Sequence, residues 1–77
     1  MFEILEQIPF MNGKMKCTPM IRIHPYTLVR REATFELWIA AYYCKYENGE
    51  GSWSNGNYFS TAEDALRYIL SRTEEQK

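Results

Sequence analysis

Apolar residues recur at helical spacing near the C-terminal end of the chain. They follow one another at intervals of three and four, which places their side chains on one stripe of a helix. The stripe consists of Ala62, Ala65, Leu66, Ile69 and Leu70. The spacing predicts an amphipathic helix within residues 58–72, and such a helix needs a second layer to cover.

The start of this helix is marked by two overlapping capping signals. Ser60 and Thr61 can each accept a hydrogen bond from a first-turn N–H, and each has an acidic residue three positions later, Glu63 and Asp64. Either register is compatible with the sequence, so the first helical residue is fixed to within one position.

Residues 34–46 alternate between two sets of side chains, as an extended strand does. One set comprises Phe35, Leu37, Ile39, Ala41 and Tyr43, and the other Glu36, Trp38, Ala40, Tyr42, Cys44 and Tyr46. We expect the first set to face the helix, with Phe35, Leu37, Ile39 and Ala41 packed against its apolar stripe.

Shorter sequence patterns predict three further strands and two turns. Residues 15–24 contain Pro19 and predict an irregular or edge strand, whereas residues 26–30 and 52–58 predict two further strands. Asn12-Gly13 and Asn48-Gly49 are typical of tight hairpin turns. Residues 2–8 fit a helix or an extended segment, and the pattern does not choose between them.

Strands joined by short turns and followed by a helix predict an α+β domain. We expect two layers, an antiparallel sheet of three to four strands with the C-terminal helix on one face. A chain of 77 residues makes one domain, spanning residues 1–77. We expect the polar tail, residues 72–77, to fray.

Composition limits the setting and the partners. The net charge is −1, but residues 7–31 carry five Lys or Arg and no acid. No apolar run reaches the length of a membrane span, and the N-terminus lacks the features of a signal peptide, so we expect a cytoplasmic protein without membrane contact. Cys17 and Cys44 have no metal-site spacing; we take them as reduced, with a disulfide between strands as the alternative.

The residue types needed for catalysis do not group in this sequence. His24 is the only histidine, and it lies in a basic segment without a recognisable nucleophile partner. The acidic pairs belong to the helix start and to a turn. We therefore expect a protein that is not an enzyme and needs no metal or other cofactor.

A stripe of aromatic residues is the best candidate for a binding surface. Trp38, Tyr42 and Tyr46 recur at intervals of four, and Trp53 on the returning strand can lie opposite one of them. With the basic residues Arg22, Arg30 and Arg31, they form the predicted partner-binding site. The alternative is that residues 2–10 cover the stripe.

Two classes of partner fit such a site. Trp, Tyr and Arg are enriched at the centres of protein interfaces, so a protein partner comes first. A nucleic acid, stacked on the aromatic sheet face beside the basic segment, is the alternative. A homodimer is compatible with both, through the aromatic face or through an edge strand near residues 20–30.

The arrangement of a few antiparallel strands followed by Phe59-Ser60-Thr61-Ala62-Glu63-Asp64-Ala65-Leu66 resembles small proteins of phages and mobile elements. Anti-CRISPR proteins and host-takeover inhibitors are among these proteins. The resemblance implies a protein that acts by occupying a surface of a larger host protein or nucleoprotein complex, without catalysis. It implies no functional residue by position.

Overall fold

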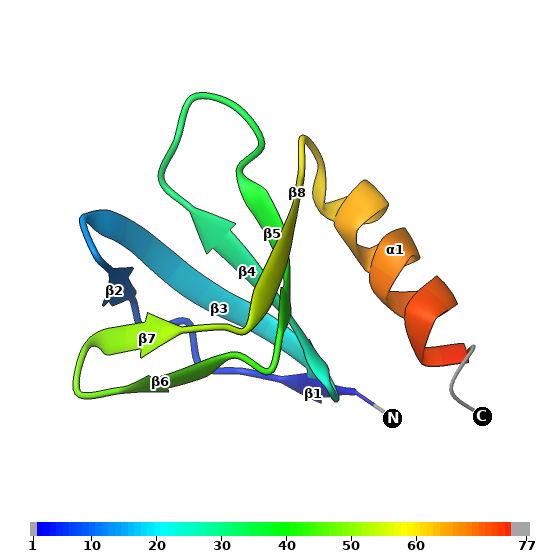
Figure 1. The fold of residues 1–77 in the computed structure, drawn as a ribbon, viewed down its shortest axis with the longest axis horizontal. Coiled ribbons are helices and arrows are strands. Elements are labelled where there is room, and N and C mark those ends of the chain that lie inside the picture. Colours follow the sequence, from blue (N-terminus) through cyan, green and yellow to red (C-terminus); the bar gives the residue numbers. More distant parts are fainter. Residues whose placement is uncertain (1, 75–77) are drawn as a thin grey trace.

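The structure is a computed structural model that describes residues 2–74. Within these residues, eight strands precede one helix (Figure 1). The elements are β1 (Glu3–Ile4), β2 (Phe10–Asn12), β3 (Met15–Ile23), β4 (Tyr26–Arg31), β5 (Trp38–Tyr42), β6 (Lys45–Glu47), β7 (Glu50–Ser52), β8 (Asn55–Phe59) and α1 (Ala62–Glu74). The α+β class and the C-terminal helix are confirmed, whereas the expected three to four strands are too few.

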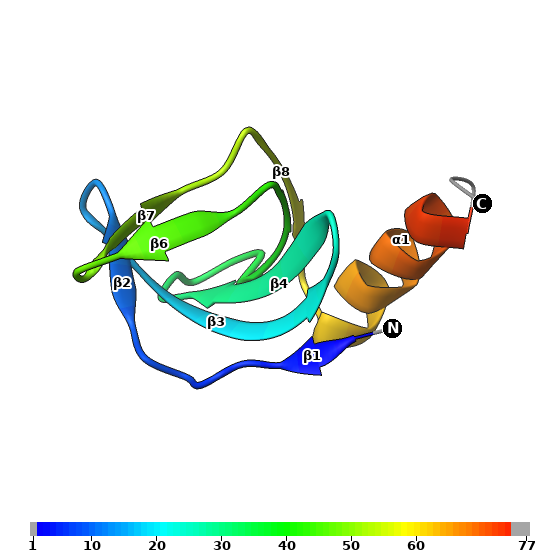
Figure 2. The same ribbon diagram turned by 90° about the horizontal axis from the view of Figure 1, so that it is seen from below.

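The strands form one sheet in the order β6-β7-β2-β3-β4-β5-β8, and β1 pairs with β3 beside β2. The pairs are antiparallel except that of β2 with β7, which is parallel and made at Met11 and Glu50. The sheet curls strongly, so that the β6–β7 hairpin lies over its concave side (Figure 2). Curling gives this small domain two separate apolar cores.

The inner core lies on the concave side and the outer core lies between the convex side and the helix. The inner core contains the buried residues Phe10, Cys17, Val29, Ile39, Ala41 and Cys44, with Met15, Tyr46 and Trp53 packed against them. The outer core contains the buried residues Tyr26, Leu28, Ala40, Ala65 and Ile69. Strands β4 and β5 therefore contribute buried side chains to both faces.

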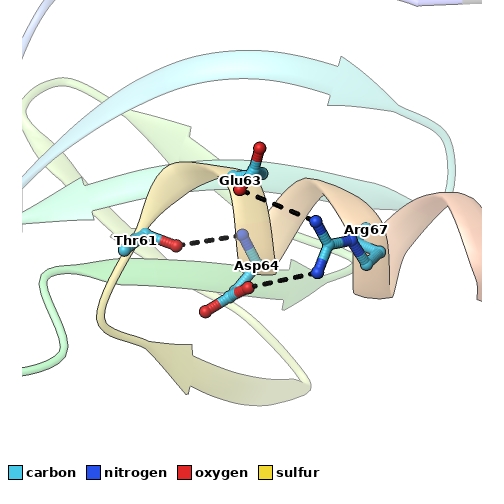
Figure 3. Close-up of polar contacts among 4 residues, drawn as sticks. All are labelled: Thr61, Glu63, Asp64 and Arg67. Atoms are coloured by element: carbon cyan, nitrogen blue, oxygen red, sulfur yellow. Dashed lines mark hydrogen bonds and ion pairs between the residues drawn. The ribbon is translucent and has the colours of Figure 1, made fainter.

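The helix starts where one of the two capping signals places it. Thr61 Oγ1 accepts a hydrogen bond from the backbone N–H of Asp64 at 3.1 Å (Figure 3). Arg67 lies 3.6 Å from both Glu63 and Asp64, but these are exposed ion pairs that add little stability. The helix continues to Glu74, which lies within the segment expected to fray, and residues 75–77 lie outside the described part of the chain.

The predicted orientation of the strand beneath the helix is wrong, because the opposite set of side chains faces the helix. Ile39 and Ala41 face the inner core, and Ala40, with its neighbours Trp38 and Tyr42, faces the helix. Phe35 lies in the β4–β5 connection and is 77% exposed, so it does not pack against the helix. Ala40 and Ala65 are both fully buried in the outer core, and their small side chains leave room for the helix to approach the sheet closely.

Of the two alternatives that Pro19 indicates for β3, the irregular strand is confirmed and the edge strand is wrong, because β3 is an inner strand with a register shift after Pro19. It pairs with β4 along one side and with β1 and β2 along the other. Residues 18–20 have no paired residue on the second side, although the N–H of Leu5 donates to the carbonyl of Met20 at 3.0 Å. The pairing with β4 shifts register between Pro19 and Ile21, and an irregularity of this kind accommodates a proline, which has no N–H to donate.

Candidate functional site

The four predicted aromatic residues do not form one stripe. Trp38 and Tyr42 are half-buried in the outer core, whereas Tyr46 and Trp53 pack against the inner core. The alternation fails at Tyr43, whose φ of 51° breaks the extended backbone between β5 and β6. Tyr46 consequently lies on the opposite side from Trp38.

Different elements cover the two halves of the predicted stripe. Trp38 and Tyr42 pack against the outer core, to which the helix contributes Ala65 and Ile69. Phe10 stacks on Tyr46 with ring centres 5.0 Å apart. The alternative that residues 2–10 cover the aromatic face therefore holds for one half of it, through Phe10. Phe2, Ile4 and Ile8 of that segment are exposed.

Two of the three predicted arginines, Arg30 and Arg31, contact residues of their own domain close to them in the fold. The Arg30 guanidinium carbon lies 6.0 Å from the centre of the Trp38 ring. Arg31 donates from Nε to the carbonyl of Glu36 at 2.8 Å and from Nη2 to the carbonyl of Phe35 at 3.0 Å. Arg31 thus holds the β4–β5 connection in place.

Arg22, the third predicted arginine, lies at a cavity of about 510 Å³ beside the β3–β4 turn. We call it the basic cavity. Its lining comes from the end of β3, the turn, the start of β4 and the β5–β6 connection: Arg22, His24, Pro25, Tyr26, Thr27, Tyr43, Cys44, Lys45 and Tyr46. Two lysine or arginine side chains, one histidine and three tyrosines face this space, and none of its lining residues is acidic.

Tyr43 fixes the rim of the basic cavity. A positive φ is unusual for a bulky residue, and here the Tyr43 N–H donates to the carbonyl of Pro25 at 2.8 Å. The Tyr43 ring meets His24 edge-on at 5.7 Å and Tyr42 edge-on at 4.5 Å. The ring is 46% exposed, so it presents an anchored apolar surface next to the cationic groups.

Cys44 is the candidate nucleophile among the lining residues. Burial raises the pKa of its thiol to about 11, although the positive charge of Arg22 acts in the opposite direction. A thiol with this pKa is protonated at neutral pH and reacts slowly. The cavity therefore offers positive charge and aromatic surface, and its thiol is not activated.

Two shallower depressions adjoin the basic cavity at Lys45. One, of about 570 Å³, includes the acidic residues Glu47 and Glu50 of the β6–β7 hairpin. The other, of about 320 Å³, includes Tyr43 and Trp53. Lys45 borders all three, and the acidic hairpin limits the positive region to the neighbourhood of Arg22 and Lys45.

Sequence reasoning found two residues of the basic cavity, Arg22 and Tyr46, and missed His24, Tyr43 and Lys45 as possible contact residues. The missed residues lie at strand ends far apart in the sequence. Pro25 is the one signal that could have helped, because a histidine-proline pair between two apolar runs indicates a turn at the end of a sheet.

No metal site or membrane span is found in the described part of the chain. Residues 2–74 contain no group of three or more His, Cys, Asp or Glu side chains arranged to hold a metal ion. They also contain no helix long and apolar enough to cross a bilayer. Cys17 and Cys44 are both free and buried in the inner core, in agreement with the expected reduced state and not with a disulfide.

Comparison of the chain with protein-family models, with curated proteins and with solved structures gave no match.

Proposed function

We propose that the protein is a small non-catalytic binding module that holds a protein partner through the basic cavity. The observation that supports this proposal is the cavity lining, in which Arg22, His24 and Lys45 surround an acid-free space beside the exposed ring of Tyr43. Arginine and tyrosine are enriched among the residues that dominate protein interfaces. The fitting ligand is an acidic side chain with an apolar neighbour that packs on Tyr43.

The distribution of charge favours a protein over a nucleic acid. Nucleic acids are usually bound by a basic track that follows successive phosphates. Here Arg22 and Lys45, two of the nine lysines and arginines of the chain, line one cavity, and Glu47 and Glu50 lie in the next depression. The alternative also needs an open aromatic sheet face, and the helix lies against Trp38 and Tyr42 on that face.

The resemblance to small phage proteins suggests how such a binding module would act and where. A module of this kind would act as an inhibitor by occupying a surface of a larger host protein or nucleoprotein complex. Its setting would be the cytoplasm, where two buried free thiols remain reduced. No catalytic step and no cofactor enter this proposal.

Selection from a random-peptide library tests the proposal. Peptides are selected on the parent protein and compared on Arg22→Gln/Lys45→Gln. We expect the enriched peptides to share an acidic residue and to bind the double variant at least roughly tenfold more weakly. In amide NMR spectra of the parent protein, they should shift the signals of residues 22, 43 and 45.

The matched control removes the same two charges elsewhere. Lys14→Gln/Arg67→Gln changes two exposed residues outside the basic cavity and should leave peptide affinity unchanged. Equal binding to both double variants would refute the proposal. Tight binding of single-stranded DNA instead, with affinity that falls steeply with salt, would support the nucleic-acid alternative.

A further inference from the structure

The free edges of the sheet differ in how they are protected. Within residues 2–74, β1, β6 and β8 each pair with a strand on one side alone. Strand β1 has two residues and includes Glu3, and β6 has three residues and includes Lys45 and Glu47. Short length and charge are the usual devices that prevent a free edge from pairing with another chain.

Strand β8 has none of these devices. It is five residues long, Asn55–Phe59, and it pairs with β5 over its whole length without a register shift. It contains no proline and no charged residue, and the surrounding run from residue 51 to residue 62 is also uncharged. A long, regular and neutral edge of this kind can accept a further strand.

The helix lies against the face of β8. Asn57 Nδ2 donates to the Tyr68 hydroxyl at 3.1 Å, and the Phe59 and Tyr68 rings lie 5.4 Å apart. No strand in the described part of the chain pairs with the side of β8 that faces away from β5. Backbone N–H and C=O groups on that side have no ladder partner among residues 2–74.

We propose that β8 pairs with β8 of a second copy of this chain, in antiparallel orientation about a two-fold axis. Such an axis sets a segment against itself, so a charged edge would meet its own charge, whereas this edge carries none. The two sheets then continue into one, and both α1 helices lie on the same face of it.

This surface replaces the one that the sequence indicates for self-association. Residues 20–30 lie in β3 and β4, which are inner strands. Strand β8 contributes no residue to the basic cavity, so the dimer and the proposed function stand or fall separately.

Sedimentation velocity and hydrogen exchange together test the dimer. From micromolar to near-millimolar concentration, the mass should rise from the 9.2 kDa of one chain to twice that value. Over the same range, the backbone amides of residues 55–59 that do not bond to β5 should become protected from exchange. Those of β6, at another free edge, should not change.

A charge on the edge should weaken the dimer. Asn55 is exposed, and Asn55→Lys should raise the dimer dissociation constant by roughly a factor of five, because a lysine on an edge strand disfavours pairing with a further strand. Gln7→Lys adds the same charge on an exposed residue outside the strands and should have no effect. A mass that stays at one chain, or a dimer whose β8 amides remain unprotected, would overturn the proposal.

Discussion

The guanidinium of Arg31 lies over the ring of Tyr58, 4.6 Å from the ring centre. The same group donates to the carbonyls of Phe35 and Glu36, and its Nη1 lies 3.6 Å from the sulfur of Met15. Arg31 therefore joins β8, the β4–β5 connection and β3. This set of contacts explains why an arginine selected from the sequence as a binding residue has a structural role.

Replacing Arg31 by lysine should destabilise the fold by about 1–3 kcal/mol. Lysine keeps the charge but cannot donate to the two carbonyls in a planar arrangement while it also stacks on Tyr58. Urea denaturation measures the change. Arg30→Lys is the matched control, and it should cost less than about 1 kcal/mol because Arg30 is exposed and lies 6.0 Å from the Trp38 ring. Equal losses in the two variants would contradict this role for Arg31.

The helix should depend on Ile69 more than on its other apolar residues. Ile69 is fully buried, Leu66 is half-buried and Leu70 is 49% exposed. We expect Ile69→Ala to lower the free energy of unfolding by about 2–5 kcal/mol, Leu66→Ala by less, and Leu70→Ala by a few tenths. Chemical denaturation of the three variants gives the ranking. A larger loss for Leu70→Ala than for Ile69→Ala would mean that the helix is rotated about its axis.

The part of the fold that sequence reasoning found depends on neighbouring residues. The helix start follows from Thr61 and Asp64, which are three positions apart. The turn at Asn48 and Gly49 follows from two adjacent residues that tolerate positive φ, and the structure has 52° and 79° there. All the residues that determine such a structure lie within one turn of the chain, so it can be predicted without knowledge of the tertiary structure.

The register of β5 could not be found in this way because the strand is buried on both faces. Alternation assigns a face to the core when the other face is polar. Here Ile39 and Ala41 face one core and Ala40 faces the other. Both faces of the strand are apolar, so the sequence does not show which face packs against the helix. The basic cavity was missed for a related reason, since pairing across β3, β4 and β5 is what brings Arg22 and Tyr43 together.

Gly51 should not tolerate a side chain. A Cβ atom at this position would lie 2.5 Å from Cδ1 of Phe10 and 2.7 Å from Cβ of Tyr46. The Phe10 ring can turn, but Cβ of Tyr46 moves only with the backbone of β6. We expect Gly51→Ala to cost about 1–3 kcal/mol, as crowding a packed core does, and Ser52→Ala at an exposed neighbour to be nearly neutral. Similar denaturation midpoints for the two variants would show that β6 and β7 can separate without loss.

The two buried thiols should make the fold less stable in alkali. Burial raises the pKa of Cys44 to about 11 and raises the pKa of Cys17 above its usual value of 9.0. Well below pH 9, both thiols are protonated in the folded and the unfolded chain, so they do not affect the pH dependence. Between pH 9 and about pH 11, the unfolded chain releases protons that the folded chain keeps, and stability falls as the pH rises.

Urea midpoints measured across this range separate the thiols from the tyrosines and lysines, which also titrate in alkali. Cys44→Ala removes the group with the larger shift, so its stability should fall less steeply than that of the parent between pH 9 and pH 11. Lys14→Ala is the control at an exposed residue and should keep the parent's slope. Alkylation by iodoacetamide gives a second measure, because a protonated, buried thiol should react far more slowly in the folded protein than in urea. Parallel curves for the parent and Cys44→Ala, with rapid alkylation of the folded protein, would mean that water reaches Cys44 through the basic cavity.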